Sequence, residues 1–253
     1  EGQMFSHESA ALLHGIHLEA VPELVQVIAP GRSKSWRTGH RNIRCRRLPA
    51  GSAYEIDGHP CTSLALTMSH LACALPHRQA MIACDSALGL ATGHSRAPHA
   101  DAGMRTTALT MLEGLGPVKG VARARLVLAT ADGRAESPAE TISRIVLSRV
   151  GLAPSALQFR VDDEYRQTIG YADFAWEAAR VLGEYDGEGK YFELAAGQGA
   201  RRVFLKEKWR QQRIEEMGWV VVRWGKDELS RPELLAAAVR RGMAAARARG
   251  LVA

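Results

Sequence analysis

Apolar and polar positions alternate in three successive segments of the C-terminal half of the chain. These segments are ALQFRVDDEY, QTIGYADFAW and ARVLGEYDG. A period of two places side chains on alternate faces of an extended chain, so the pattern predicts three strands in a meander. A fourth segment, WVVVRWG, is almost wholly apolar and predicts a short strand in a buried position.

Three helical patterns surround these strands. SPAETISRIVLSRVGL has Ser137 as a cap, Pro138 at the first helical position and Glu140 at the third, which forms a capping box. FLKEKWRQQRIEEMG predicts a charged helix that ends at Gly218. RPELLAAAVRRGMAAARARG predicts an amphipathic closing helix. The predicted order is helix–strand–strand–strand–helix–strand–helix.

The pattern differs before residue 131. ELVQVIAP, NIRCRRL and AYEI predict short strands, and Ser6 and either Thr62 or Ser63 are candidate helix caps. Three further helical segments follow them. We therefore predict an α/β protein with an N-terminal α+β module at 1–131, followed at 132–253 by a mixed sheet flanked by helices.

Composition excludes several classes of protein. The chain has 253 residues, of which 46% are hydrophobic and 6% aromatic, and no apolar run approaches the roughly 18 residues of a membrane span. With no signal peptide at its start and no CxxC among its four cysteines, we expect a cytoplasmic protein with reduced thiols. The nine histidines are confined to the first 99 residues, but their spacings match no closed zinc site.

The net charge of +6 is unevenly distributed along the chain. The segment 31–47 contains seven cations and no acid: Arg32, Lys34, Arg37, Arg41, Arg44, Arg46 and Arg47. Such a run usually forms a solvated face, but it also suits the phosphate backbone of a nucleic acid. From this segment alone, the two interpretations are equally balanced.

Carboxylates lie where the predicted meander should bury hydrocarbon. Glu184 and Asp186 are two residues apart and so share a face, and antiparallel pairing could bring Asp173 beside Glu184. Glu140 could reach the same place from its helix. Carboxylates gathered in this way repel one another unless a cation is present, and oxygen ligands favour Mg²⁺ or Mn²⁺ over zinc.

A hard cation at this place would suit phosphodiester hydrolysis, because it polarises a phosphoryl oxygen and lowers the pKa of a bound water. Lys190 is then the candidate to stabilise charge on the phosphorane. The alternative is an ordinary hairpin with solvated acids and a glycine turn.

Two longer stretches carry a resemblance to known families. DFAW and GEYDGEGKY, followed by KEKWRQQRIEEMGWVVVRW, resemble the very-short-patch-repair-like branch of the PD-(D/E)xK, restriction-endonuclease-like superfamily. Nearly the whole chain is similar to actinobacterial type IV antitoxin (AbiEi-like) proteins, through SHESAALLHGI, DGHPCTSLALTMSHLA, ACDSAL and AESPAETISR. The resemblance implies a restriction-endonuclease-like fold for 132–253.

The resemblance also implies roles for single residues. Asp173 corresponds to the metal-binding aspartate, Glu184 to the acid of the ExK element and Glu140 to the acid on the helix. Asp186 stands where the superfamily usually has its lysine, and Lys190 is the candidate to replace it. Polar helix residues that line the cleft in this branch correspond to Arg144, Glu207 and Arg210.

The resemblance and the residues together suggest two functions. The first is a Mg²⁺- or Mn²⁺-dependent DNA endonuclease or nickase, in a defence or toxin–antitoxin context. The second is a catalytically inactive DNA-binding regulator or antitoxin on a nuclease-like scaffold. In both we expect DNA binding with weak sequence preference by the basic segment and by Lys206, Arg210 and Arg213, unless these form an intrahelical salt-bridge ladder. A partner protein or a homodimer is left open.

Overall fold

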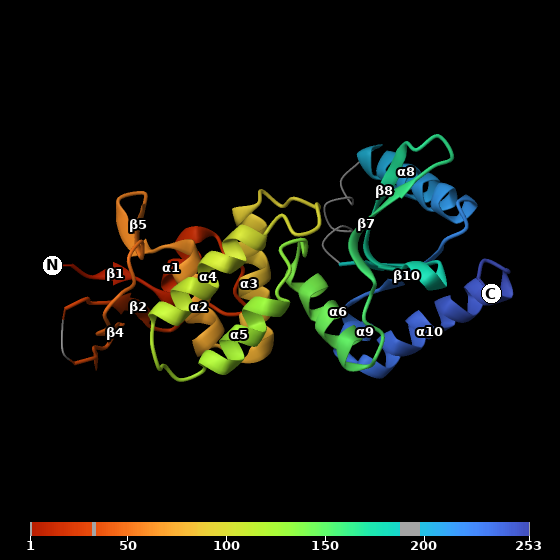
Figure 1. Ribbon diagram of the computed structural model, residues 1–253. Coiled ribbons are helices and arrows are strands. Elements are labelled where there is room, and N and C mark those ends of the chain that lie inside the picture. Colours follow the sequence, from red (N-terminus) through yellow and green to blue (C-terminus); the bar gives the residue numbers. More distant parts are fainter. Residues whose placement is uncertain (1, 32–33, 188–197, 253) are drawn as a thin grey trace. The chain divides into compact units, whose positions relative to one another are not determined.

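A computed structural model of the protein describes residues 2–31, 34–187 and 198–252. The chain forms two compact units, Glu1–Pro138 and Ala139–Ala253. Each unit contains its own sheet and helices (Figure 1), so the α/β class predicted from the sequence is confirmed. Within the described ranges, no helix combines the length and the apolar character needed to cross a membrane.

In the N-terminal unit, α1 lies between the first two strands, and the other helices follow the last strand. Its six-stranded sheet has the order β3-β4-β2-β1-β6-β5. The strands are β1 (Met4–Phe5), β2 (Val25–Ile28), β3 (Trp36–Arg37), β4 (Arg41–Arg44), β5 (Ala53–Ile56) and β6 (His59–Thr62). The helices are α1 (His7–His14), α2 (Leu64–Ala74), α3 (His77–Ala91), α4 (Ala102–Gly114) and α5 (Val121–Thr130).

Local sequence explains two boundaries of this unit. The hydroxyl of Ser63 accepts a hydrogen bond from the backbone N–H of Leu66 and so caps α2, one of the two caps predicted there. Gly15 ends α1 with a φ of 76°, a left-handed conformation that glycine adopts without steric cost. The core is built around α2 and α3, whose fully buried side chains include Leu66, Leu71 and Leu88.

The C-terminal unit has a four-stranded sheet of order β10-β9-β8-β7. Its elements are α6 (Pro138–Arg149), β7 (Ala156–Asp162), β8 (Thr168–Trp176), the 3-10 turn η1 (Glu177–Ala179), β9 (Val181–Tyr185), α8 (Gln198–Glu216), β10 (Val220–Trp224), α9 (Lys226–Ser230) and α10 (Pro232–Ala248). The strands β7, β8 and β9 form the predicted antiparallel meander, and β10 pairs in parallel with β9.

Helices cover both faces of this sheet. On one face, Leu147 of α6 and Leu235 and Val239 of α10 pack with Phe174 and Trp224. On the other face, Ile214 of α8 joins a second cluster that contains Leu182. The strand β10 lies at the edge of the sheet, and its apolar sequence is explained by the helices above and below it.

A close approach of side chains fixes the centre of the first face. A Cβ atom on Gly183 would lie 2.6 Å from Trp224 and 3.0 Å from Trp176, so only glycine leaves room for the two indoles. The indole N–H of Trp224 donates to the Ser143 hydroxyl over 2.9 Å, which satisfies a polar atom inside the apolar cluster.

Candidate functional site

Asp173 and Glu140 meet at the junction of α6 with β7 and β8, through the side-chain amide of Gln158. The amide nitrogen of Gln158 lies 3.2 Å from Oε2 of Glu140 and 3.4 Å from Oδ1 of Asp173. The other carboxylate oxygen of Asp173 accepts the backbone N–H of Tyr185 over 2.8 Å. Thus Glu140 does reach Asp173 from its helix, with an amide as the link between them.

Gln158 has a strained backbone at this position. Its φ is 46° although it lies within β7, and its side chain is buried, with 6% of the residue exposed. A non-glycine residue in the left-handed region costs about 1–3 kcal/mol, and such residues concentrate at functional sites. Gln158 is not among the site residues predicted from the sequence. The signal for it was a polar glutamine between the apolar residues of ALQF, in a predicted strand.

Glu184 belongs to a different group of charges. Its Oε1 lies 2.7 Å from a guanidinium nitrogen of Arg210, and its Oε2 lies 3.0 Å from Nε of Arg223. Both arginines also bind Glu207. The structure therefore engages both oxygens of Glu184 with arginines, and the register of β9 and β10 places Arg223 directly opposite Glu184.

Glu184, Glu207, Arg210 and Arg223 form a charge network in which each acid pairs with both arginines. The hydrogen bond from Arg210 is the main cause that lowers the pKa of Glu207, with Arg223 adding to it. The hydrogen bond that Arg210 donates to Glu207 raises the pKa of Arg210 in turn, and Glu184 contributes. The Glu207–Arg210 pair is an intrahelical salt bridge of the kind considered as the alternative for this helix.

Of the remaining predicted residues of the acidic centre, the structure describes Asp186, which directly follows β9. Asp186 is half-buried, and its backbone N–H donates to the carbonyl of Trp224 over 2.9 Å. Lys190 lies outside the described residues. Within the part of the chain that the structure describes, no group of three or more His, Cys, Asp or Glu side chains could hold a metal ion. Of the predicted carboxylates, Glu140 and Asp173 are brought together through Gln158, whereas Glu184 is engaged by two arginines.

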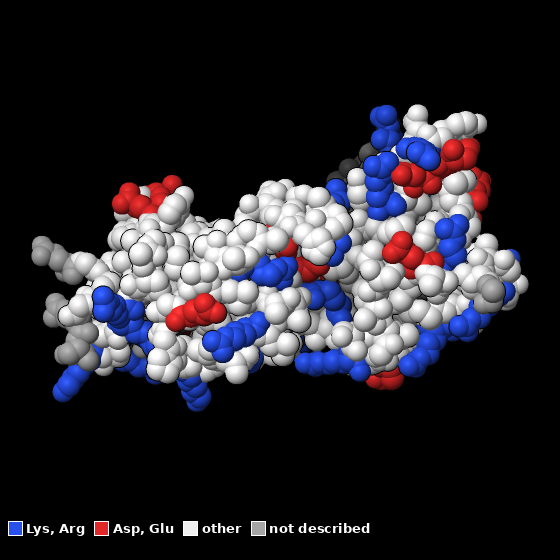
Figure 2. Space-filling view, viewed as in Figure 1, with Lys and Arg blue, Asp and Glu red and all other residues white. Residues whose placement is uncertain are grey.

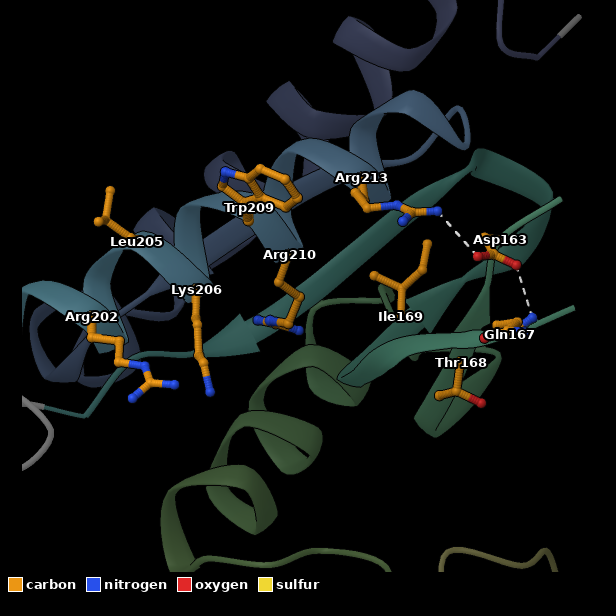
Figure 3. Close-up of a pocket in the computed structure, with 10 residues that line it drawn as sticks. All are labelled: Asp163, Gln167, Thr168, Ile169, Arg202, Leu205, Lys206, Trp209, Arg210 and Arg213. Atoms are coloured by element: carbon orange, nitrogen blue, oxygen red, sulfur yellow. Dashed lines mark hydrogen bonds and ion pairs between the residues drawn. The ribbon is translucent and has the colours of Figure 1, made fainter. Parts of the chain in front are cut away.

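A basic groove of about 730 Å³ lies between α8 and the β7–β8 hairpin (Figure 3). Arg202, Lys206 and Arg210 project from α8 on the same side, and Arg213 reaches Asp163 of the hairpin over 3.1 Å. Two large apolar side chains of α8 line it and are unusually exposed, Trp209 at 71% and Leu205 at 48%. Basic and acidic side chains lie side by side over α8 (Figure 2).

The basic segment 31–47 divides into two parts. Arg37 and Arg41 are exposed on β3 and β4. Arg44, which is half-buried, and Arg46, which is exposed, line a cavity of the N-terminal unit, where Arg44 donates to Oε1 of Gln26 over 2.6 Å. The sequence suggested one continuous cationic face, and the structure shows a face and a cavity.

Comparison with known proteins gives two similar sequences of unassigned activity. Both are called uncharacterized proteins of Mycobacterium tuberculosis, one from strain CDC 1551 / Oshkosh and one from strain ATCC 25618 / H37Rv. Each is 34% identical over 133 residues, which are 52% of this chain and 46% of the relative, so the match spans about half of each protein. No family model matches the chain, and no solved structure gives a significant match.

Proposed function

We propose that the C-terminal unit binds DNA along α8 with weak sequence preference. The observation that carries the proposal is the groove in which Arg202 and Lys206 lie beside the exposed indole of Trp209. Cations that track a phosphate backbone together with an aromatic ring that stacks on bases are the usual means of sequence-tolerant binding.

The cations of the groove should contribute unequally to the attraction of DNA phosphates. Arg210 pairs with Glu184 and Glu207, and Arg213 pairs with Asp163. These acids neutralise the two arginines, which therefore hold α8 against the sheet and the hairpin more than they attract an anion. Arg202 and Lys206 are exposed, and neither is paired with an acid among the residues that the structure describes. These two side chains should therefore supply most of the attraction for phosphate.

Fluorescence anisotropy with a short labelled duplex at several salt concentrations tests this proposal. We expect Arg202→Gln with Lys206→Gln to weaken binding about tenfold, and to reduce the slope of log K against log salt by about one for each lost contact. Lys226→Gln is the matched control, because Lys226 is an exposed cation of the same unit on α9. Binding that ignores salt, or an equal loss in the control, would refute phosphate-led recognition.

A second candidate function is metal-dependent hydrolysis of phosphodiester bonds. It is favoured by the strained Gln158, which holds Asp173 and Glu140 together in one place. These two carboxylates would hold Mg²⁺ or Mn²⁺, and the ion would supply Lewis-acid activation of a phosphoryl group. Asp173 would be oriented by the Tyr185 N–H, and Lys190 remains the predicted cation for the developing charge.

Incubation of supercoiled plasmid with the protein and Mg²⁺ or Mn²⁺ separates the two functions. Nicking that Asp173→Asn abolishes and Glu164→Gln retains would support an endonuclease or nickase, since Glu164 is an exposed acid of the β7–β8 hairpin. Plasmid that is retarded in a gel but left intact would support the regulator or antitoxin. In either role we propose that the protein acts on DNA in the cytoplasm.

A further inference from the structure

The N-terminal unit contains a cavity of about 600 Å³ that none of the roles above uses. Five segments of the chain form it: α1, the end of β4 with the residues after it, the end of α2, the connection from α4 to α5 and the start of α5. The charged or titratable side chains that define it are His7, Arg44, Arg46, His70, Lys119 and Arg123.

Two stacked imidazoles form the buried wall of this cavity. The rings of His7 and His70 lie 4.2 Å apart between centroids and 3° from parallel, and the residues are 6% and 3% exposed. Nδ1 of His7 lies 3.0 Å from the Ser6 hydroxyl. Within the described residues, neither ring nitrogen of His70 has a hydrogen-bond partner. A buried donor without a partner lowers the stability of the fold by about 1–3 kcal/mol, so a ligand that accepts a hydrogen bond from His70 would remove this cost.

The charge of the wall indicates the sign of that ligand. Among the described residues that line the cavity, four carry a positive charge and none a negative charge. Burial, and then the charges of Arg44 and Arg46, lower the pKa of His70 to about 3, so its ring is neutral and offers one N–H donor. Glu8 is the acid that acts on Arg44, and it offsets part of this field. An anion is the complementary ligand.

The backbone of α5 adds to this preference. Gly120 lines the cavity at the N-cap of α5 with a φ of 93°, and no side chain caps the helix start. A Cβ atom there would lie 2.4 Å from the carbonyl oxygen of Cys73, so glycine permits α5 to start close against α2. The start of this ten-residue helix thus lies at the wall of the cavity, and the N-terminus of a helix favours negative charge.

We propose that this cavity binds a phosphomonoester of nucleotide size. The phosphoryl oxygens would accept hydrogen bonds from His70 and pair with Arg46 and Lys119. A dianionic group with three acceptor oxygens suits this many donors better than a carboxylate does. The organic part would lie against Leu115 and Val118, which form an apolar section of the wall. The volume falls within the range of small-molecule sites, about 300–1,000 Å³, and exceeds what a phosphate ion alone requires.

The test uses the full chain with inorganic phosphate, a nucleoside 5′-monophosphate and the parent nucleoside, measured by calorimetry and by melting temperature. We expect phosphate to raise the melting temperature, the monophosphate to bind more tightly and the nucleoside to have no effect. Absence of any effect from both phosphate compounds, or equal binding of the nucleoside, would overturn the proposal.

Two variants distinguish the cavity from general positive charge. Arg46→Gln should weaken binding of the monophosphate about tenfold. Arg47→Gln is the matched control, because Arg47 is an exposed neighbour that does not line the cavity. An equal loss in both variants would contradict a specific site. His70→Leu should abolish the ligand-induced shift without lowering the melting temperature of the free protein, because it removes a polar group that lacks a partner.

The same phosphate chemistry could come from a free nucleotide or from the end of a nucleic acid. A short oligonucleotide with a 5′-phosphate and its 5′-hydroxyl counterpart separate these sources in the Arg202→Gln, Lys206→Gln variant, in which the α8 groove is weakened. A preference for the phosphorylated end that Arg46→Gln removes identifies a nucleic-acid end. Equal binding of both oligonucleotides, with tight binding of the monophosphate, identifies a free nucleotide.

Discussion

Arg210 of α8 lies 2.7 Å from Glu184 of β9, so a helix that crosses the sheet neutralises an acid at the end of one of its strands. The contact is largely shielded from water, because the Glu184 side chain is 13% exposed and that of Arg210 is 24%. Arg223 approaches the same carboxylate from β10. Glu184 therefore contributes to holding α8 and β10 on the sheet.

Glu184→Gln should reduce the free energy of unfolding by about 1–3 kcal/mol, because it leaves two partly buried guanidinium groups with a weaker acceptor. If Glu184 were instead one of several crowded metal-binding carboxylates, Glu184→Gln would raise the free energy of unfolding in metal-free buffer, because it would relieve their repulsion. Urea denaturation with chelator decides between these signs. Glu164→Gln, on the exposed hairpin, should change stability by less than about 0.5 kcal/mol.

Acid should weaken the same network. Arg210, with Arg223, holds the pKa of Glu207 below its usual value of 4.5. A carboxyl group whose pKa is lower in the folded state stabilises the fold above the unfolded pKa, and this stabilisation is lost as the pH falls through the folded pKa. The unfolding free energy of the wild type should thus decline below about pH 4.5, and Glu207→Gln should flatten this decline. Parallel curves for the two proteins would exclude a contribution from Glu207.

The backbone of Gln158 can be separated from its side chain by two substitutions. Gln158→Ala and Gln158→Gly both remove the amide that joins Glu140 to Asp173, but only glycine adopts a φ of 46° without strain. The glycine variant should therefore be more stable than the alanine variant by about 1 kcal/mol. If plasmid nicking is found, both variants should lose it. Equal stability would show that the conformation relaxes when the side chain is absent.

Trp209 should affect binding of single strands more than stability. Its indole is 71% exposed, so Trp209→Ala should shift the melting temperature little. If a base stacks on it, binding of a single-stranded oligonucleotide should weaken by about 1–3 kcal/mol, and duplex binding should weaken less. Tyr54→Ala removes another exposed aromatic ring, in the N-terminal unit and outside the basic segment, and should leave both affinities unchanged. A similar loss in this variant would argue against a role specific to α8.

Strand periodicity predicted the meander of the C-terminal unit because each strand carries its own alternation. The partners of Glu184 were not predictable in this way, because Arg210 and Arg223 are 26 and 39 residues distant. Arg223 meets Glu184 through the parallel pairing of β10 with β9, and Arg210 meets it from α8. The glutamine link between Asp173 and Glu140 depends on the left-handed backbone at Gln158, which no periodicity indicates. The roles of Glu140, Asp173, Asp186 and Lys190 in metal binding and catalysis stay predictions.

The position of His70 at the wall of the cavity was equally hidden from the sequence. The helix pattern LALTMSHLACA places this residue among apolar neighbours, which is also where an ordinary core histidine would lie. Only the tertiary structure brings Arg46 and the start of α5 to the same place. Charge along the chain therefore indicated that phosphate could be a ligand, but not that Arg44 and Arg46 line a cavity.

The parallel pairing of β10 with β9 has a consequence for the order in which the unit assembles. Strands β7, β8 and β9 can pair as soon as each turn closes, whereas β10 can join only after α8 has crossed the face of the sheet. The charge network at Glu184 and the groove under α8 should thus form in the last step of folding. A chain arrested before that step would keep the β7–β8–β9 meander but would lack the groove that is proposed to bind nucleic acid.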